Sequence, residues 1–271
     1  MVAFAANSLL CRLALRETEI DAATFTGVRI LSGALALALL VRARGASTVR
    51  GGDWVSAAAL FAYAIAFSFA YRELSAGTGA LLLFGAVQAC MILWGWQRGE
   101  RPIPVQVAGF ALAVGGLVWL VWPRVTAPPL LAASSMLVAG IAWGIYSLRG
   151  RGVSDPLAST AGNFLRAVPF ALVAVALGLA QARFPARGVA LAAVSGAVTS
   201  GVGYAVWYSA LRSLDATRAA TVQLCVPLLA VIGGAFFLDE RLDRRVLVAA
   251  ATILGGIGLV VTRRTRRKRN P

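Results

Sequence analysis

Long apolar segments, separated only by short charged or Pro/Gly-containing turns, run along the whole chain. Of its 271 residues, 59% are hydrophobic and 14% are charged, and histidine is absent. Soluble domains carry about 25% charged residues, so this chain has too few charges to cover a water-exposed surface. A bilayer-spanning helix takes about 20 apolar residues, so ten such helices would use about 200. The sequence therefore predicts an all-α membrane protein with short loops and no separate soluble domain.

The apolar segments predict ten transmembrane helices. They cover approximately residues 1–15, 24–41, 54–71, 75–97, 104–122, 130–148, 158–181, 188–211, 215–238 and 245–262. The first segment is short and begins at Met1 with no polar or basic residue before it, so we expect part of the first helix to be missing from this start. A secretory signal peptide would need a basic leader and a small-residue cleavage site, which this segment lacks.

Basic residues set the expected orientation in the lipid bilayer. Six of the last nine residues, 263–271, are lysine or arginine. A nucleic-acid-binding tail is one interpretation, but we favour a cytoplasmic stop-transfer cluster, because Lys and Arg concentrate in the cytoplasmic flanks of spans. The even-numbered loops together with this tail carry 15 basic residues against 9 on the other side, and the excess comes from the tail. We therefore expect a multi-pass protein of the inner (cytoplasmic) membrane, with both termini in the cytoplasm and no nucleic-acid partner.

The chain offers little for metal or covalent chemistry. Cys11, Cys90 and Cys225 are far apart and each lies in an apolar segment, so neither a disulfide framework nor a metal site is expected. Without histidine, paired intramembrane carboxylates or a nucleophile beside a base, the sequence favours neither an enzyme nor a cofactor. A purely structural membrane scaffold is another alternative, but it would not need polar residues at matched depths in both halves.

An internal repeat at an offset of 140 residues organises the chain. Three short motifs recur in order: Glu100-Arg101 as Glu240-Arg241, Gly115-Gly116 as Gly255-Gly256, and Leu74-x-Ala76 as Leu214-x-Ala216. Because each unit holds five spans, an odd number, the second copy must enter the membrane from the opposite side. Secondary transporters are often built this way, with the substrate site between the repeats. We therefore expect two inverted five-helix units, residues 1–122 and 123–262, around a central cavity, followed by the basic tail 263–271.

These features resemble a known family of transporters. The two units end in similar turns, Gly99-Glu100-Arg101 and Asp239-Glu240-Arg241, each followed by a helix with Gly-Gly, and so resemble the paired EamA domains of the drug/metabolite transporter superfamily. Asn7 and Arg29 also resemble positions in that family's first repeat. In length, aromatic content and lack of acids in spans, the chain is most similar to YddG-type aromatic amino-acid exporters. The resemblance implies ten helices, cytoplasmic termini and a cavity that opens alternately to each side, with an exported amino acid as substrate.

All eleven acidic residues lie in predicted loops or at helix ends. Proton-driven pumps usually bury a carboxylate or a histidine that titrates as the cavity changes sides, and the predicted spans contain neither. The sequence therefore favours a facilitator or exchanger of neutral or zwitterionic solutes over a proton-coupled antiporter.

Aromatic and amide side chains are the candidate substrate ligands. Aromatic rings recur on single helix faces, as at Tyr63, Phe67 and Tyr71, and amides at mid-membrane depth need partners from a neighbouring helix or a solute. The predicted substrate-binding residues are Asn7, Tyr63, Gln88, Trp143, Tyr146, Tyr204, Trp207, Tyr208 and Gln223. The first helix is expected at the edge of the cavity that they line. Because Tyr and Trp also anchor helices at membrane interfaces, interfacial anchoring is the alternative role for each aromatic residue.

Pro227 is the candidate hinge. It follows Gln223 by four residues, so the Gln223 carbonyl lacks its usual intrahelical donor. Transporters use such helix discontinuities for binding and bending.

Arg29 and Arg166 are the charged residues farthest inside predicted spans. A charge in hydrocarbon costs about 2.5 to 3.5 kcal/mol on insertion scales, so each must be compensated. One interpretation makes one of them the partner of a substrate carboxylate. The interpretation we favour at this stage is structural, with both side chains reaching the interface or capping backbone carbonyls.

Together these features predict a secondary transporter that exports amino acids, aromatic or otherwise hydrophobic, by alternating access as a facilitator or exchanger. Other amphipathic metabolites or drugs are the alternative substrates. The oligomeric state is left open by the sequence.

Overall fold

The computed structural model describes residues 1–45, 51–97, 103–122, 127–151, 153–211, 223 and 225–262. Its long helices are α1 (Val2–Glu17), α2 (Ala22–Ala43), α3 (Trp54–Tyr71), α4 (Ala76–Gln97), α5 (Pro104–Val121), α6 (Leu130–Arg149), α7 (Pro156–Leu177), α11 (Cys225–Phe237) and α12 (Arg244–Thr262). A short 3-10 helix, η1 (Leu179–Gln181), follows α7. The predicted helix over 188–211 is an uninterrupted run of α8 (Ala186–Val194), the π-helix η2 (Ser195–Val202) and α9 (Gly203–Leu211). Every predicted apolar segment thus contains helix, and the described part of the chain has no strand.

Six of the described helical segments are long and apolar enough to cross a membrane. They are Ala22–Ala43, Trp54–Tyr71, Ala76–Gln97, Leu130–Arg149, Pro156–Leu177 and Ala186–Trp207. Shorter apolar helices lie at Pro104–Leu120 and Cys225–Phe237. Large apolar side chains face outward from several helices, with Leu177 85% exposed and Phe236 80% exposed. A surface of this kind fits a lipid solvent rather than water, so the fold is that of a multi-pass membrane protein.

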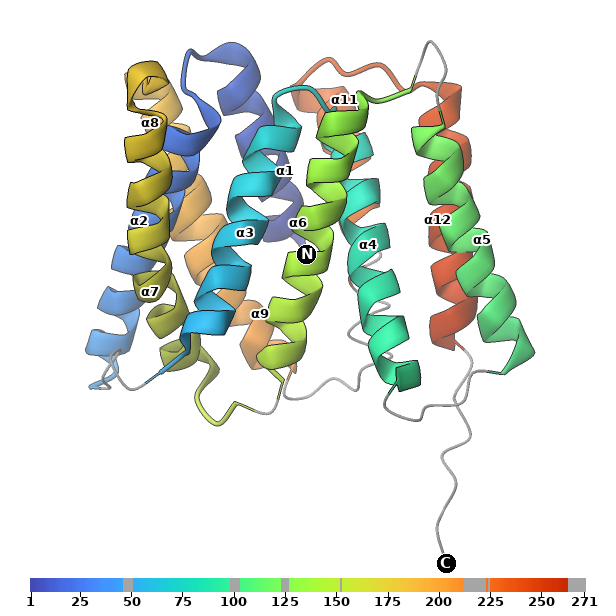
Figure 1. Ribbon diagram of the computed structural model, residues 1–271, viewed down its shortest axis with the longest axis horizontal. Coiled ribbons are helices and arrows are strands. Elements are labelled where there is room, and N and C mark those ends of the chain that lie inside the picture. The colour runs from blue at the N-terminus through green and yellow to red at the C-terminus, as the bar shows by residue number, and fades with distance from the viewer. Residues whose placement is uncertain are drawn as a thin grey trace, which may run out of the picture.

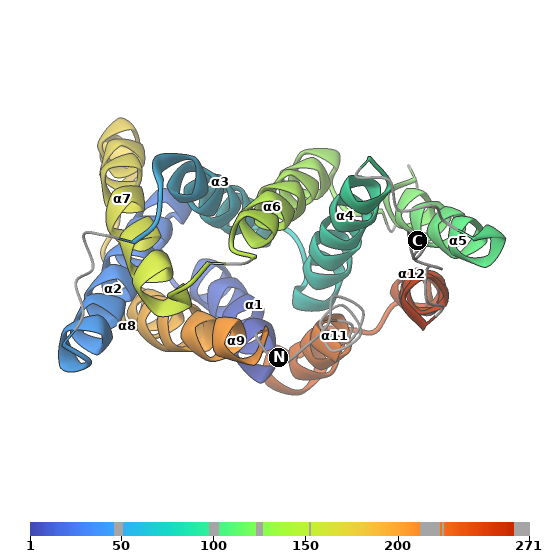
Figure 2. The ribbon, with the colours of Figure 1, turned by 90° about the horizontal axis from the view of Figure 1, so that it is seen from below.

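The helices run roughly side by side along one direction, as Figure 1 shows. The most extensive packing joins α5 with α12, α3 with α6, α2 with α7 and α4 with α6, and α4 also packs on α11. Helices α5 and α12 lie together at one end of the molecule (Figure 2). Helix α1 lies in the middle, where it contacts α11, η2, α8, α3 and α4. The first helix, predicted at the edge of the cavity, instead lies at the centre, with Phe4, Asn7 and Ser8 buried.

Acidic residues begin several helices. Asp21, Asp53 and Asp155 are the N-cap residues of α2, α3 and α7, and each carboxylate accepts a hydrogen bond from a first-turn backbone N–H. A carboxylate at this position satisfies an otherwise unpaired donor and interacts favourably with the positive end of the helix dipole. The scarce acids of this chain therefore act at the membrane boundaries, as the sequence predicts for their positions.

Glycines bring pairs of helices into backbone contact. A Cβ atom at Gly140 or Gly144 would meet α4 at Leu83 O and Cys90, so this pair forms a packing seam between α6 and α4. Of the two repeated Gly-Gly pairs, Gly116 and Gly256 face neighbouring helices, whereas a Cβ atom added at Gly115 or Gly255 would meet nothing within 4 Å. Only one glycine of each pair therefore serves close approach.

The contact between α2 and the π-helix is tighter still. A Cβ atom added at Gly196 would overlap Ser32 Oγ and Arg29 O of α2. A Cβ atom added at Gly33, also on α2, would lie 3.0 Å from Gly196 O. These glycines let the two backbones approach until Ser200, one helical turn beyond Gly196, reaches the side chain of Arg29.

We expect Gly196→Ala to destabilise the protein by about 1 to 3 kcal/mol or more, because the added methyl group forces α2 and η2 apart in a closely packed region. The matched control is Gly255→Ala, at a membrane-helix glycine where the added Cβ meets no atom within 4 Å. Thermal unfolding of the two purified variants in one detergent measures the difference. An equal effect of both substitutions would contradict the proposed close contact.

Candidate functional site

A small cavity lies near the centre of the bundle. Its walls are aromatic, apolar and amide or hydroxyl side chains from α1, α3, α4, α6 and α9: Phe4, Asn7, Ser8, Tyr63, Phe67, Leu83, Phe84, Trp143 and Tyr204. Its volume is about 10 Å³, which is room for about one water molecule. The void at the predicted central position is therefore too small for an amino acid, and a solute-sized central cavity stays a prediction.

Asn7 connects α1 to the π-helix and to α3. Its Oδ1 accepts hydrogen bonds from Ser195 Oγ at 2.7 Å and from Thr199 Oγ1 at 3.3 Å. Its Nδ2 donates to the Tyr63 hydroxyl at 3.3 Å. Ser195 and Thr199 are four residues apart on η2, and π-helical turns often occur at functional sites. The amide is thus held in one orientation in the wall of the cavity.

Arg29 lies directly behind this wall. Its side chain is 1% exposed, so the sequence-based interpretation that it reaches the membrane interface is wrong. The guanidinium donates from Nε to Ser200 Oγ at 3.1 Å and from Nη2 to the hydroxyls of Tyr63 and Tyr204 at 3.0 and 3.4 Å. The sequence could not show this, because the position of a residue along a helix does not tell which neighbour covers it.

Aromatic faces surround the same guanidinium. Its central carbon lies 5.2 Å from the ring centre of Tyr63 and 5.1 Å from that of Phe67. Such cation-π contacts stabilise a desolvated arginine. Arg29 forms no ion pair with any acid in the described chain, and its Nη1 has no hydrogen-bond partner. The centre therefore holds a positive charge whose partners are all neutral.

Arg166 has a different environment. Its Nη1 donates to the backbone carbonyls of Gly51 and Gly162 at 2.6 and 3.1 Å. Gly51 precedes α3 at a membrane boundary, so Arg166 ties α7 to that boundary. The capping interpretation from the sequence fits this arginine, although it fails for Arg29.

The rings at the centre contact one another. Trp143 lies 4.9 Å from Tyr63 and 4.8 Å from Tyr204, measured between ring centres. Phe4 meets Trp143, Tyr204 and Trp207 edge to face at 5.6 to 5.9 Å. The structure thus brings together Asn7, Tyr63, Trp143 and Tyr204 on the cavity, with Trp207 packed behind Phe4.

The other predicted ligands do not line this cavity. Tyr146 is buried and stacks on Trp143 at 5.5 Å. Gln88 is buried one helical turn from the cavity residue Phe84, and its Nε2 has no hydrogen-bond partner. Gln223 is also buried. The side chain of Tyr208, on α9, lies outside the part that the structure describes. Pro227 lies within the described helix α11.

Several cavity residues were not singled out from the sequence. Phe4 and Ser8 belong to α1, and Leu83 and Phe84 belong to α4. The signal for the first two was available, because Phe4, Asn7, Ser8 and Cys11 share one face of a helix at spacings of three and four. Nothing comparable marks Leu83 or Phe84, which look like any apolar residue in a span.

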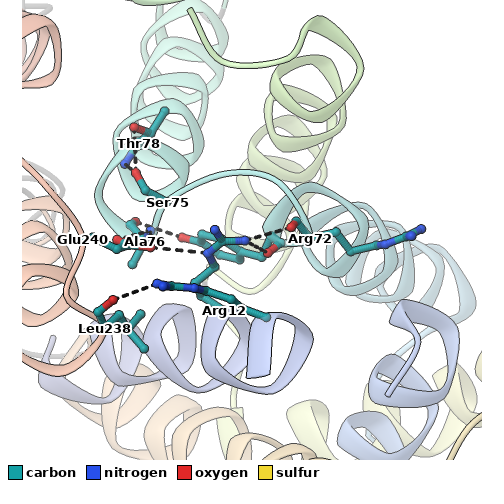
Figure 3. Close-up of polar contacts among 9 residues, drawn as sticks. Arg12, Arg72, Ser75, Ala76, Thr78, Leu238 and Glu240 are labelled. Carbon is teal, nitrogen blue, oxygen red and sulfur yellow. Dashed lines mark hydrogen bonds and ion pairs between the residues drawn. The ribbon is translucent and has the colours of Figure 1, made fainter. Parts of the chain in front are cut away.

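A second polar cluster closes one end of the bundle (Figure 3). Glu240, in the turn between α11 and α12, accepts two hydrogen bonds from the backbone N–H of Ala76, at 2.8 and 3.1 Å, and one from Arg12 Nε at 3.3 Å. Arg12 also donates to the carbonyls of Tyr71 and Arg72. The carboxylate thus joins the start of α4 to α1 from a distant turn. The glutamate of the repeated Glu-Arg motif therefore has a structural role at this copy. Its earlier copy, Glu100-Arg101, lies outside the described residues.

Glu240 is buried enough to perturb its ionisation. Burial raises the pKa of its carboxyl above the ordinary value, although the Ala76 N–H and Arg12 favour the charged form. Because the folded state then holds a proton at higher pH than an exposed glutamate would, mild acid protonates this carboxyl earlier than the surface acids.

An ion pair also links helices at the opposite end. Arg149, the last residue of α6, donates to Asp53 Oδ1 at 2.9 Å and to Ser56 Oγ at 3.0 Å, both at the start of α3. Burial acts to raise the pKa of Asp53, but the hydrogen bonds from Ser56 and Arg149 lower it overall. Both ends of the bundle are therefore tied by side-chain ion pairs.

Comparison with known proteins gives consistent matches over the whole length. A model described as the EamA-like transporter family matches residues 1–122 and 130–262. An uncharacterized protein of Pseudomonas aeruginosa is 54% identical over 269 residues, covering 98% of this chain and 93% of that protein. An uncharacterized transporter of Archaeoglobus fulgidus is 25% identical over 279 residues, covering 97% and 95%. A solved crystal structure shares the fold with a TM-score of 0.66 at 18% identity, covering 95% of this chain and 94% of that one.

We expect a double-mutant cycle of Arg12→Gln and Glu240→Gln to give a coupling energy of about 0.5 to 3 kcal/mol, because both side chains are largely buried and are hydrogen-bonded to each other. The matched control is the cycle on Arg183 and Glu19, whose side chains are 65% and 77% exposed. That exposed pair should couple by less than about 1 kcal/mol. Unfolding in detergent measures both cycles, and equal coupling would argue against a specific tie at Glu240.

Proposed function

The chain belongs to the EamA-like transporter family and so carries a small solute across a membrane, and from that premise we propose that it exports amino acids with aromatic or other hydrophobic side chains. Transport proceeds by alternating access, as a facilitator or an exchanger. The observation that carries this proposal is the composition of the centre. Phe4, Asn7, Tyr63, Trp143 and Tyr204 line a small cavity, and Arg29 lies behind Tyr63.

The chemistry of this centre suits an amino acid with an apolar side chain. Aromatic rings bind an apolar or aromatic group through buried area and edge-to-face contacts. Fixed polar groups beside them orient the charged end of the solute. The predicted ligands Gln88, Tyr146, Trp207, Tyr208 and Gln223 belong to the same proposal, as groups that meet the solute when the cavity enlarges.

The proposed architecture is ten spans in two inverted repeats, residues 1–122 and 123–262. The packing pattern supports it, because α2 pairs with α7, α4 with α11 and α5 with α12, which are the corresponding helices of the two units. Corresponding helices also run in opposite directions, as the paths of α1 and α6 illustrate (Figure 1). The tail 263–271 is placed on the cytoplasmic side of an inner membrane. The end of the bundle that carries Glu240 then faces away from the cytoplasm.

Alternating access follows from the two tied ends. Breaking the Arg12–Glu240 cluster would open one end of the bundle, and breaking the Arg149–Asp53 pair would open the other. The cavity would then enlarge toward one side at a time. Bending is assigned to Pro227 and to the π-helix η2, where the regular hydrogen-bond ladder is interrupted. No buried acid among the described spans is available for proton coupling at the cavity, which supports a facilitator or exchanger.

Other amphipathic metabolites or drugs are the alternative substrates. An aromatic cavity without an acid also accepts neutral amphipathic solutes. Counterflow with neutral, zwitterionic and cationic compounds in parallel separates the two proposals, because the amino-acid proposal requires that zwitterions move fastest.

We expect purified protein in liposomes preloaded with L-phenylalanine to take up labelled L-phenylalanine by counterflow. Trp143→Leu should weaken apparent affinity about tenfold, because it removes ring contacts worth about 0.5 to 1.5 kcal/mol each from the cavity wall. The matched control is Trp122→Leu, at an exposed ring away from the cavity, which should behave as the wild type. Absence of counterflow for every amino acid tested would defeat the proposed function.

A further inference from the structure

The charge of Arg29 has no counter-charge in the described chain. Its guanidinium is fully buried and bonds only hydroxyl groups, while every described acid lies at a helix end or in a loop. Burying an unpaired charge is costly, and neutral hydrogen-bond partners recover only part of that cost. An intramembrane charge that is kept without a partner usually marks the path of a substrate.

The Tyr63 hydroxyl links Arg29 to the cavity. Its oxygen accepts from both Arg29 Nη2 and Asn7 Nδ2, and Tyr63 is also hydrogen-bonded to Tyr204. Tyr63 lines the cavity. The adjacent cation polarises this hydroxyl, so a negatively charged oxygen in the cavity is its best acceptor.

An unpaired guanidinium nitrogen alone does not mark a site. Arg245, at the start of α12, also has guanidinium nitrogens without hydrogen-bond partners, but it bonds the carbonyls of Trp119 and Trp122 at a membrane boundary. Arg29 differs because two residues that it bonds, Tyr63 and Tyr204, are themselves walls of the central cavity. Its full burial also keeps lipid headgroups away from it.

We propose that Arg29 and Tyr63 form the recognition site for a substrate carboxylate, so that the protein selects solutes that carry a carboxylate beside an aromatic or apolar group. This inference rests on the proposed transport through the central cavity and adds the chemical class of the substrate. The carboxylate neutralises the buried cation, and the ring of the solute replaces part of the contact among Phe4, Trp143 and Tyr204.

The same geometry assigns no comparable role to the ammonium group. Asn7 Oδ1, the one amide oxygen on the described cavity wall, already accepts from Ser195 and Thr199. Among the residues that the structure describes, none of those lining the cavity is an acid. A solute with a carboxylate and no ammonium group should therefore be accepted, whereas one with an ammonium group and no carboxylate should be rejected.

A panel of three related compounds tests this on the unmodified protein. L-Phenylalanine has both charged groups, 3-phenylpropionate has only the carboxylate, and 2-phenylethylamine has only the ammonium group. Each is tested in proteoliposomes for its ability to drive counterflow of the same labelled compound. We expect counterflow of 3-phenylpropionate at a rate at least about tenfold above that of 2-phenylethylamine, since a hydrogen-bonded pair with a charged group is worth about one to two factors of ten.

The outcomes separate this inference from the proposed function. Counterflow of 3-phenylpropionate without that of any amino acid would support carboxylate recognition and defeat amino-acid export. Counterflow of L-phenylalanine and 2-phenylethylamine without that of 3-phenylpropionate would overturn carboxylate recognition and leave amino-acid export standing.

Substitutions assign the effect to the named residues. Arg29→Gln should weaken the apparent affinity for 3-phenylpropionate about 10- to 100-fold, and Arg29→Lys should weaken it less because the charge is kept. Tyr63→Phe removes the hydroxyl without changing the ring. Its matched control on the same helix is Tyr71→Phe, because Tyr71 does not line the cavity and its hydroxyl bonds Ala76 O. Unchanged 3-phenylpropionate affinity in a folded Tyr63→Phe protein would overturn the assignment, whether or not Arg29→Gln folds.

Discussion

The high cost of placing charge in hydrocarbon decides how this protein is built. Its acids start helices at the membrane boundaries, where Asp21, Asp53 and Asp155 cap backbone donors. Its ion pairs also lie at the ends of the bundle, as at Glu240 and Arg149. Because each tie joins different helices, the few charges outside the membrane core fix how the apolar helices meet. Arg29 departs from this rule, and that departure draws attention to the centre.

Close helix contact makes the central arrangement possible. Without a hydrophobic driving force between helices in lipid, small residues and buried polar bonds hold them together. Gly196 brings the π-helix onto α2, and Ser195 and Ser200 then reach Asn7 and Arg29 from the same short segment. The polar network and the packing are therefore one structure, in which a shift of η2 alters both the helix contact and the wall of the cavity.

The sequence predicts the helices well and the site in part, for a physical reason. The bilayer requires each spanning segment to be long, apolar and free of charges, so such segments can be recognised directly in the sequence. Each predicted segment contains helix. The faces of Tyr63, Trp143 and Tyr204 follow from helix periodicity, and these residues do meet. Which helix is central does not follow from periodicity, since it depends on how faces far apart in sequence pair. For this reason the sequence alone predicts Arg29 at the membrane interface and does not identify Phe4 as a cavity residue. It also assigns Gln88 to a cavity that this residue does not line.

An uncompensated cation at the centre also bears on the transport cycle. On the proposed mechanism, the loaded protein carries a neutral pair of guanidinium and carboxylate, whereas the empty protein must rearrange its ends with the charge unpaired in a low-dielectric interior. Both states break the same ties at Glu240 and Arg149, so those ties do not distinguish them. The charge does, because the empty protein has a higher barrier to the change of access. Exchange of one carboxylate-bearing solute for another is then faster than net export. Because the described spans contain no acid, the substrate itself supplies the counter-charge for Arg29.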